Sequence, residues 1–324
     1  MLSTAISHFR TQGGLKLLKQ WFKCGVLSVA ASEIILLGCS NKALEILRLV
    51  VEMKIQKKLR AKYLKLLNKT YQESTEDVIQ QVSKRIWIFW WQGMDNAPEL
   101  VKKCFSSLHK HLDDWEIVLI TNKNYLDYVS FPSFIIEKMS EGKITLTHFS
   151  DMLRLELLIK YGGLWLDSTV FCSGSNFPQS IINSDLFVYQ TQKPGADGHT
   201  TLMSSWFIYA KANNKILKAT RYLLYSYWEK KNTLIDYFLL HHFFTISCQY
   251  YKEEARRIPP LCNTVPHILL LHLFETYDRC FWEDLKRQTC FHKLSYKLDE
   301  DKCKEKGTYY DVIIHEDGQS YRLG

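Results

Sequence analysis

The sequence of 324 residues lacks an apolar run long enough to cross a bilayer. Its most apolar stretch, residues 25–39, is short and is interrupted by Ser28, Ser32 and Glu33, whereas a transmembrane helix needs about 20 apolar residues. The beginning of the chain also lacks the layout of a secretory signal peptide. We therefore expect a cytoplasmic protein that does not span a membrane.

Cysteine pairs of the C-x-x-C type are missing as well. The nine cysteines are scattered between Cys24 and Cys303, their number is odd, and several lie in apolar runs. This pattern is typical of reduced thiols in a cytosolic protein. Internal repeats and low-complexity segments are also absent, and 46% hydrophobic with 23% charged residues is an ordinary globular composition.

Acidic residues are absent between Lys54 and Lys69, where seven residues are basic. Residues 1–85 hold 15 Lys/Arg against 6 Asp/Glu, so the net charge of +8 belongs to this part of the chain. Apolar residues recur there at helical spacing, at Leu44, Leu47, Val51, Ile55, Leu59 and Tyr63. Two interpretations remain open. The helix lies on an anionic membrane, or it packs on the body or on a second copy with its lysines in solvent.

The basic helix also permits a non-catalytic function, the binding of an anionic surface or of nucleic acid. Its charge is confined to one helix, however, and the sequence shows no interleaved aromatic and basic residues. We therefore expect no nucleic-acid partner, and the sequence predicts no oligomeric state. Residues 1–83 are predicted to form a basic helical arm, and residues 84–324 to form the body.

The body alternates strands and helices. Strands are predicted at residues 85–91, 115–120, 164–166, 186–190 and 205–210, and helices at 98–110, 134–140, 148–161, 216–228, 235–250 and 268–279. The first strand, RIWIFWW, is apolar throughout, which suits burial on both faces of a parallel sheet. With the helix and strand that follow, it forms a βαβ unit. The predicted fold class is α/β, a Rossmann-like, mostly parallel sheet flanked by helices.

One polar constellation falls where a helix meets a strand. Asp151 and Arg154 share a helix face, Gly162 and Gly163 permit a sharp turn, and Asp167 follows a short apolar strand. We expect the turn to gather these side chains at the carboxyl edge, where open α/β sheets bind ligands. A carboxylate there can hold Mg²⁺ or Mn²⁺ with phosphate oxygens and so assist departure of a diphosphate. A helix cap with an intrahelical ion pair is the structural alternative.

The run S-D-x-x-R-x-x-x-L-x-x-x-G-G-x-W-x-D-x-T resembles the signature of family 32 glycosyltransferases, closest to their capsular polysaccharide synthesis branch. Its matching positions are Ser150, Asp151, Arg154, Leu158, Gly162, Gly163, Trp165, Asp167 and Thr169. Weaker resemblance extends over residues 84–300. The resemblance implies a GT-A catalytic domain over residues 84–324, a nucleotide diphosphate sugar such as a UDP-sugar as donor, Mn²⁺ or Mg²⁺, and transfer with retention at the anomeric carbon.

The same resemblance implies roles for individual residues. Asp167 would bind the metal with help from Thr169, which stands where the wider family has a second aspartate, and from His292. Asp151 would contact ribose or the donor sugar, and Arg154 the donor hydroxyls or phosphate. Asp236 would orient the acceptor hydroxyl or accept its proton, and its alternative role is a helix cap.

Further residues are predicted to bind the donor nucleotide. Lys293 and Lys297 would close over the diphosphate. Trp91, Gln92, Thr121 and Asn122 follow the first two strands, where they can stack on or hydrogen-bond a base. Core packing is the alternative for the tryptophans, and we favour it for Trp87 and Trp90.

The sequence therefore predicts a metal-assisted glycosyltransferase. It would move a hexose from a nucleotide diphosphate sugar to a saccharide acceptor during bacterial capsule or surface polysaccharide synthesis. We expect it to work at the cytoplasmic face of the membrane, with the basic arm in peripheral contact with anionic lipids.

Overall fold

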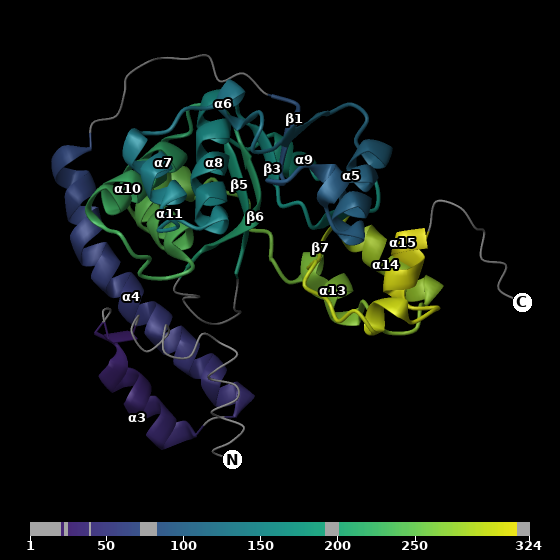
Figure 1. Cartoon of the computed structure of the whole chain (residues 1–324), viewed down its shortest axis with the longest axis horizontal. Helices are drawn as coiled ribbons and strands as arrows, with labels where there is room; N and C mark the ends of the chain where they lie inside the picture. The colour runs from purple at the N-terminus through teal and green to yellow at the C-terminus, as the bar shows by residue number, and fades with distance from the viewer. Residues whose placement is uncertain (1–20, 23–24, 39, 72–82, 192–200, 316–324) are drawn as a thin grey trace, which may run out of the picture.

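The computed structural model describes residues 21–22, 25–38, 40–71, 83–191 and 201–315 (Figure 1). A five-stranded sheet has the order β2(Glu116–Ile120), β1(Arg85–Phe89), β3(Gly163–Leu166), β6(Met203–Ala210) and β5(Leu186–Gln190). Strand β1 is parallel to β2 and β3, whereas β6 is antiparallel to β3 and β5. All strands except β6 therefore point in one direction, which confirms the predicted α/β class with a mainly parallel sheet.

Side chains alternate across the sheet, so its strands contribute to two cores. On one face, Trp87 and Trp165 pack with α8(Leu146–Tyr161), α10(Lys215–Lys230) and α11(Leu239–Tyr250). On the other, Ile86 and Leu164 pack with the end of α5(Glu99–His111) and with β4(Val170–Cys172) and β7(Phe291–Lys293). Strands β4 and β7 form a separate two-stranded sheet. Figure 1 shows α8, α10 and α11 on one side of the main sheet and α5, α14 and α15 on the other.

Shorter elements connect these layers. They are η1(Met94–Asn96), α6(Tyr125–Tyr128), α7(Ser133–Ser140), α9(Gln179–Ile182), α12(Lys252–Ala255), η2(Val265–His267), α13(Ile268–His272), α14(Arg279–Gln288), η3(Lys302–Lys304) and α15(Tyr309–His315). The strand at residues 186–190 matches its prediction, whereas β1 ends two residues before the predicted end. Trp87 is buried, as favoured from the sequence, and Trp90 is half-buried.

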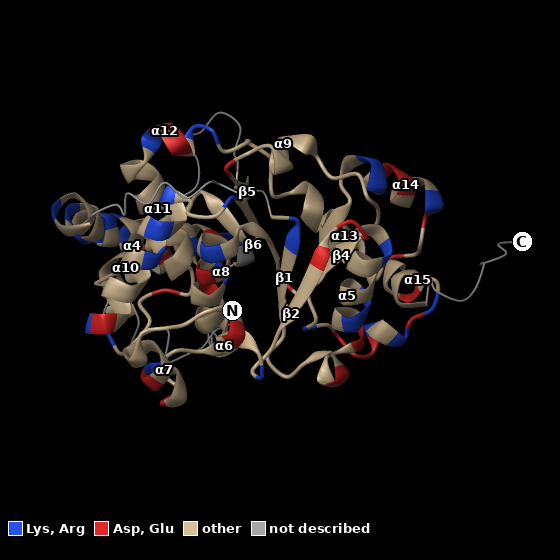
Figure 2. Cartoon of the chain, turned by 90° about the horizontal axis from the view of Figure 1, so that it is seen from above, with Lys and Arg blue, Asp and Glu red and all other residues tan. Residues whose placement is uncertain are grey.

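The basic segment forms the 30-residue helix α4(Asn41–Thr70). Its apolar stripe, including Leu47, Ile55 and Leu59, is buried, and α4 contacts α10 and α11. The seven basic residues between positions 54 and 69 are exposed, and Figure 2 shows Lys and Arg in blue along α4 at one side of the molecule. Of the two interpretations left open, the structure supports packing on the body with the lysines in solvent.

Helix α3(Leu27–Leu37) packs on α4 through Ala30, which is buried, while Ile35 and Leu36 stay exposed. Across the residues that the structure describes, no helix combines the length and the hydropathy needed to cross a membrane. The cysteines within the described residues, from Cys104 to Cys303, form no disulfide.

The helix predicted at residues 235–250 begins later, at Leu239. Asp236 does not cap it. Its Oδ1 atom instead accepts a hydrogen bond of 2.7 Å from Phe238 N in the turn before the helix. The cap interpretation of Asp236 is therefore wrong, because the side chain closes a local turn that competes with the helical conformation.

The helix predicted at residues 268–279 is also wrong, since α13 ends at His272 and α14 begins at Arg279. Between them, Tyr277 N donates to Gly307 O at 2.8 Å, and Tyr310 N donates to Leu273 O at the same distance. These partners lie far away in sequence and draw the chain out of the helix. The spacing of apolar residues cannot predict these long-range hydrogen bonds.

Candidate active site

A two-glycine turn connects α8 to β3 and determines where the site forms. Gly162 has φ +67° and Gly163 has φ +100°, values that residues with a side chain rarely adopt. A Cβ atom on Gly163 would lie 2.5 Å from Arg85 O. Arg154 lies about 10 Å back along the helix and Asp167 about 13 Å forward along the strand. The two side chains therefore return to one level, and Arg154 Nη2 is 3.9 Å from Asp167 Oδ1, which confirms the expected juxtaposition.

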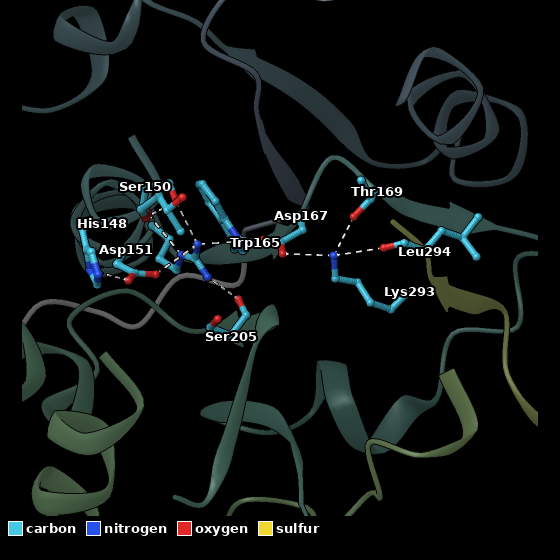
Figure 3. A network of polar contacts seen from close by, with 11 residues as sticks. His148, Ser150, Asp151, Trp165, Asp167, Thr169, Ser205, Lys293 and Leu294 are labelled. Carbon is cyan, nitrogen blue, oxygen red and sulfur yellow. Dashed lines mark hydrogen bonds and ion pairs between the residues drawn. The ribbon is translucent and has the colours of Figure 1, made fainter. Parts of the chain in front are cut away.

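Asp151 lies at the centre of a buried polar group on α8 (Figure 3). Its Oδ1 atom is 3.2 Å from Arg154 Nη2, and its Oδ2 atom is 3.2 Å from Nδ1 of His148. The helix begins at Leu146 with Thr145 as its cap, so Asp151 is not a cap residue. Its side chain is only 8% exposed.

Arg154 is anchored in the protein on several sides. Its Nη1 atom donates to Ser205 O at 2.7 Å, its Nε atom to Ser150 O at 3.1 Å, and its Nη2 atom to Ser150 Oγ at 3.0 Å. The guanidinium carbon lies 4.8 Å from the centre of the Trp165 ring, which is cation–π distance. Its side chain is 5% exposed, and its guanidinium group lies between the carboxylates of Asp151 and Asp167.

Asp167 is the carboxylate of this network that faces outward, with 30% of its side chain exposed. Trp165 Nε1 donates to its Oδ1 atom at 3.2 Å, and Lys293 Nζ lies 3.4 Å from its Oδ2 atom. Burial alone would raise the pKa of Asp167, but the charges of Lys293 and Arg154 outweigh burial and hold the pKa below its ordinary value. Asp167 is therefore ionised at neutral pH and reachable.

Lys293 comes to the site from the small sheet. Strand β7 pairs with β4 so that Lys293 lies opposite Val170, and its Nζ atom donates to Thr169 Oγ1 at 2.6 Å. The predicted positions Asp167, Thr169 and Lys293 thus meet, although more than 120 residues separate the last from the others.

The turn before α11 borders the same network. The rings of Tyr237 and His148 lie 6.2 Å apart. Burial and the nearby carboxylates of Asp151 and Asp167 raise the pKa of Tyr237. Burial also lowers the pKa of His241 to about 4, with Arg154 adding to the effect and Asp151 opposing it. Asp236 lies in this turn, and its Oδ1 atom is 3.5 Å from Nε2 of His242. The neighbouring Tyr237 and His241 are the residues whose pKa values the charges of Asp151 and Arg154 affect.

The residues predicted to bind a base lie together at the ends of β1 and β2. Asn122 N donates to Trp91 O at 3.0 Å, and Gln92 and Asn122 are exposed. The Trp91 ring is half-buried and packs on Tyr125 and Phe149, whereas Thr121 binds Asn124. Gln92 and Asn122 are thus the members of the set that face solvent.

Trp90, for which the sequence favoured core packing, is only half-buried, and the structure pairs it with Tyr296, which the sequence did not assign to the site. Trp90 and Tyr296 form an edge-to-face pair with ring centres 5.5 Å apart, and Lys297 lies over the Tyr296 ring at 6.0 Å. His148 and Tyr237 were also missed. Tyr237 directly follows a predicted site residue, which was the available signal, whereas His148 is one turn of helix from Asp151 and could have been found by that spacing.

The structure does not bring His292 to Asp167. Neighbouring residues of a strand point to opposite faces, so while Lys293 faces Asp167, His292 faces the other way and bonds through Nε2 to Ser173 Oγ at 2.8 Å. The His292 ring is fully buried beside Phe171 and Trp282, and burial lowers its pKa to about 3. Its predicted role as a metal ligand therefore does not fit its position.

The remaining donor set fits a divalent metal poorly. In the described ranges, no three His, Cys, Asp or Glu side chains are grouped as metal ligands. Asp167 is the carboxylate at the predicted metal position, and the hydroxyl of Thr169 already accepts a hydrogen bond from Lys293. The side chains of Arg154 and Lys293, both cationic, face the oxygens of Asp167. Mg²⁺ and Mn²⁺ prefer oxygen-rich, anionic surroundings. Here Arg154 and Lys293 already neutralise the negative charge of Asp167.

Comparison with known proteins agrees with the sequence resemblance. The chain is 27% identical over 164 residues to the O-glycosyltransferase braB of Annulohypoxylon truncatum, covering 45% of this chain and 38% of that protein. It is 29% identical over 112 residues to the O-glycosyltransferase PaGT of Phomopsis amygdali, covering 29% and 28%. The chain thus spans well under half the length of these relatives.

Among solved structures, the PaToxG glycosyltransferase aligns over 80% of this chain and 96% of its own, at 16% identity and a TM-score of 0.37. A family description covers more of the chain than either curated relative, since the model for capsular polysaccharide synthesis proteins matches residues 37–313, from α3 to α15. On this match, the chain belongs to the capsular polysaccharide synthesis protein family.

Proposed function

We propose that this protein is a glycosyltransferase that moves a hexose from a nucleotide diphosphate sugar to a saccharide hydroxyl. The observation that carries the proposal is the convergence of Asp151, Arg154, Asp167 and Lys293 after the carboxyl end of β3 (Figure 3). This is the edge at which α/β sheets bind ligands. The family match and the names of both curated relatives support the same reaction class.

The exposed and buried parts of the network suit different tasks. Asp167 and Lys293 are the partly exposed members, so they contact the donor, with Lys293 on the diphosphate. Asp151 and Arg154 are nearly buried and act as positioning residues for Asp167. Preorganised charges of this kind contribute most where charge develops in the transition state.

The donor and acceptor would approach from different elements. The base of a UDP-sugar would lie at the ends of β1 and β2, near Trp91, Gln92, Thr121 and Asn122. The acceptor would approach from the turn before α11, where Asp236 orients its hydroxyl. Transfer proceeds with retention at the anomeric carbon, and the product belongs to a bacterial capsule or surface polysaccharide, which the family match supports.

Donor hydrolysis tests the reaction class without knowledge of the acceptor. The purified protein, incubated with a panel of UDP- and GDP-sugars with and without Mn²⁺, should slowly release free sugar and nucleoside diphosphate. Asp167→Ala should abolish this release, whereas Asp114→Ala, which removes an exposed carboxylate paired with Lys84, should retain it. Failure of every donor to bind or turn over contradicts the proposal.

We also infer peripheral contact with an anionic membrane, made by the exposed basic face of α4 and not by its apolar stripe, which is buried on the body. The lysines of α4 are exposed, and Ile35 and Leu36 of α3 are 82% and 76% exposed. Basic side chains near an anionic surface contribute about 1 kcal/mol each. The protein should co-sediment with vesicles of phosphatidylcholine and phosphatidylglycerol at low salt and less at high salt. The Lys54→Gln, Lys57→Gln, Lys65→Gln triple variant should bind less, and equal binding to neutral vesicles would contradict the inference.

A further inference from the structure

The ammonium group of Lys293 occupies the position between the two site oxygens that follow β3. Its Nζ atom is 2.6 Å from Thr169 Oγ1, 3.4 Å from Asp167 Oδ2 and 3.4 Å from Leu294 O (Figure 3). In the family that the motif resembles, a second carboxylate stands at the position of Thr169 and would share a metal ion with the counterpart of Asp167. Here a hydroxyl stands at that position, and a side-chain cation lies between the pair.

The backbone holds Lys293 in this position. Leu294 N donates to Thr169 O at 2.9 Å, and the β4–β7 register continues that pairing through Val170 and Lys293. The Lys293 side chain is 19% exposed. Most of it is therefore packed in the protein, and the ammonium group remains accessible to a ligand. An ammonium group has three N–H donors. Thr169 and Asp167 engage two of them at most, and the carbonyl of Leu294, at 3.4 Å, is a weak competitor for the third.

We propose that the Lys293 ammonium group takes the place of the divalent metal, so that the enzyme binds the donor diphosphate and works without a metal ion. This inference rests on the proposed glycosyltransferase function. The hydroxyl at position 169 suits a lysine better than a metal, because a hydroxyl can accept a hydrogen bond from an ammonium group but offers a divalent ion no charge. Arg154, 3.9 Å from Asp167, adds a second cation to the same carboxylate.

The chemistry requires a positive charge where the leaving group departs. As the acceptor oxygen bonds to the anomeric carbon, the bond from that carbon to the diphosphate oxygen breaks, and its electron pair leaves with the diphosphate. The acceptor proton passes to the departing diphosphate. Lys293 donates a hydrogen bond to the diphosphate oxygens and stabilises the charge that develops on them. Asp167 and Thr169 hold the ammonium group in this position.

Binding of nucleoside diphosphates tests this without an acceptor or turnover. Isothermal titration of the full chain with UDP and with GDP, in EDTA and again in Mn²⁺, should give affinities within about threefold of each other for the nucleotide that binds. Lys293→Met, which keeps the stem and removes the charge, should weaken binding at least tenfold in both buffers, and Lys293→Arg should lose less. Lys304→Met, which removes an exposed lysine paired with Asp301, should match the wild type.

The outcomes separate this inference from the function beneath it. If wild-type protein binds the nucleotide only with Mn²⁺, Lys293 does not replace a metal, while the glycosyltransferase proposal stands. If neither nucleotide nor nucleotide sugar binds under any condition, both proposals fall. The EDTA comparison uses wild-type protein alone, so it decides the question even where Lys293→Met does not fold, which thermal unfolding of the variant will show.

Discussion

The Oε1 atom of Gln56 on α4 lies 2.7 Å from Nδ1 of His242 on α11. Both side chains are buried, and the other nitrogen of the same ring faces Asp236 at 3.5 Å. The basic N-terminal helix therefore supports the turn that borders the site. This contact adds a buried polar pair to the apolar packing of α4 on α10 and α11.

Gln56→Leu should destabilise the protein, because it leaves Nδ1 of buried His242 without its partner. A buried polar group that loses its hydrogen bond costs about 1–3 kcal/mol. Urea unfolding will measure the change. Lys57→Gln is the matched control on the exposed face of the same helix and should stay within about 0.5 kcal/mol of wild type. Equal stability of the two variants would show that the contact contributes nothing.

Gly163→Ala should be strongly destabilising, by about 3 kcal/mol or more, since strain at a positive φ and a steric clash add together. The new Cβ atom would lie 2.5 Å from Arg85 O on β1, which is backbone and cannot move aside alone. Gly174→Ala is the control, because no atom lies within 4 Å of its added Cβ. Thermal unfolding of both variants will show whether the turn has the stated constraint.

Asp167→Asn should lower donor hydrolysis by about 100-fold or more while leaving the fold intact. The carboxylate has a pKa below its ordinary value of 3.8 in the folded protein. Its stabilising effect is therefore complete above about pH 5 and is lost progressively as the pH falls further. The difference in unfolding free energy between wild type and variant should shrink from pH 5 to pH 3. A constant difference over that range would mean that the charge of Asp167 does not stabilise the fold.

His292 should make the protein less stable as the pH falls. Burial, with a contribution from Lys286, lowers its pKa from 6.5 to about 3, so between these values the unfolded chain binds a proton that the folded chain does not. The unfolding free energy should drop by up to about 1.4 kcal/mol per pH unit from this residue. The unfolding free energy, measured with denaturant at pH 7, 6 and 5, should fall less steeply with decreasing pH for His292→Gln than for the wild type. An identical dependence on pH in the two proteins would refute the assignment.

Much of the site's core was predictable because it is local. The S-D-x-x-R and G-G-x-W-x-D segments lie within twenty residues of each other, and helix and strand rises return Arg154 and Asp167 to one level whatever the rest of the chain does. The two glycines likewise indicate a turn, because Gly162 and Gly163 adopt positive φ angles that residues with a side chain rarely adopt. The longer strands and helices in the first half of the body followed from apolar spacing for the same reason, whereas the short elements α6, β4 and α9 did not.

The sequence by itself determined the α/β class, the α8–β3 turn and the carboxylate at the strand end, since short-range backbone geometry specifies each of them. Only the tertiary structure decided that α4 covers α10 and α11, that the turn of Tyr237 borders Asp151, and that of two neighbouring residues Lys293 faces Asp167 while His292 faces away. The last of these outcomes depends on which face of β7 meets the site, and that is set by pairing with β4, more than a hundred residues earlier in the chain.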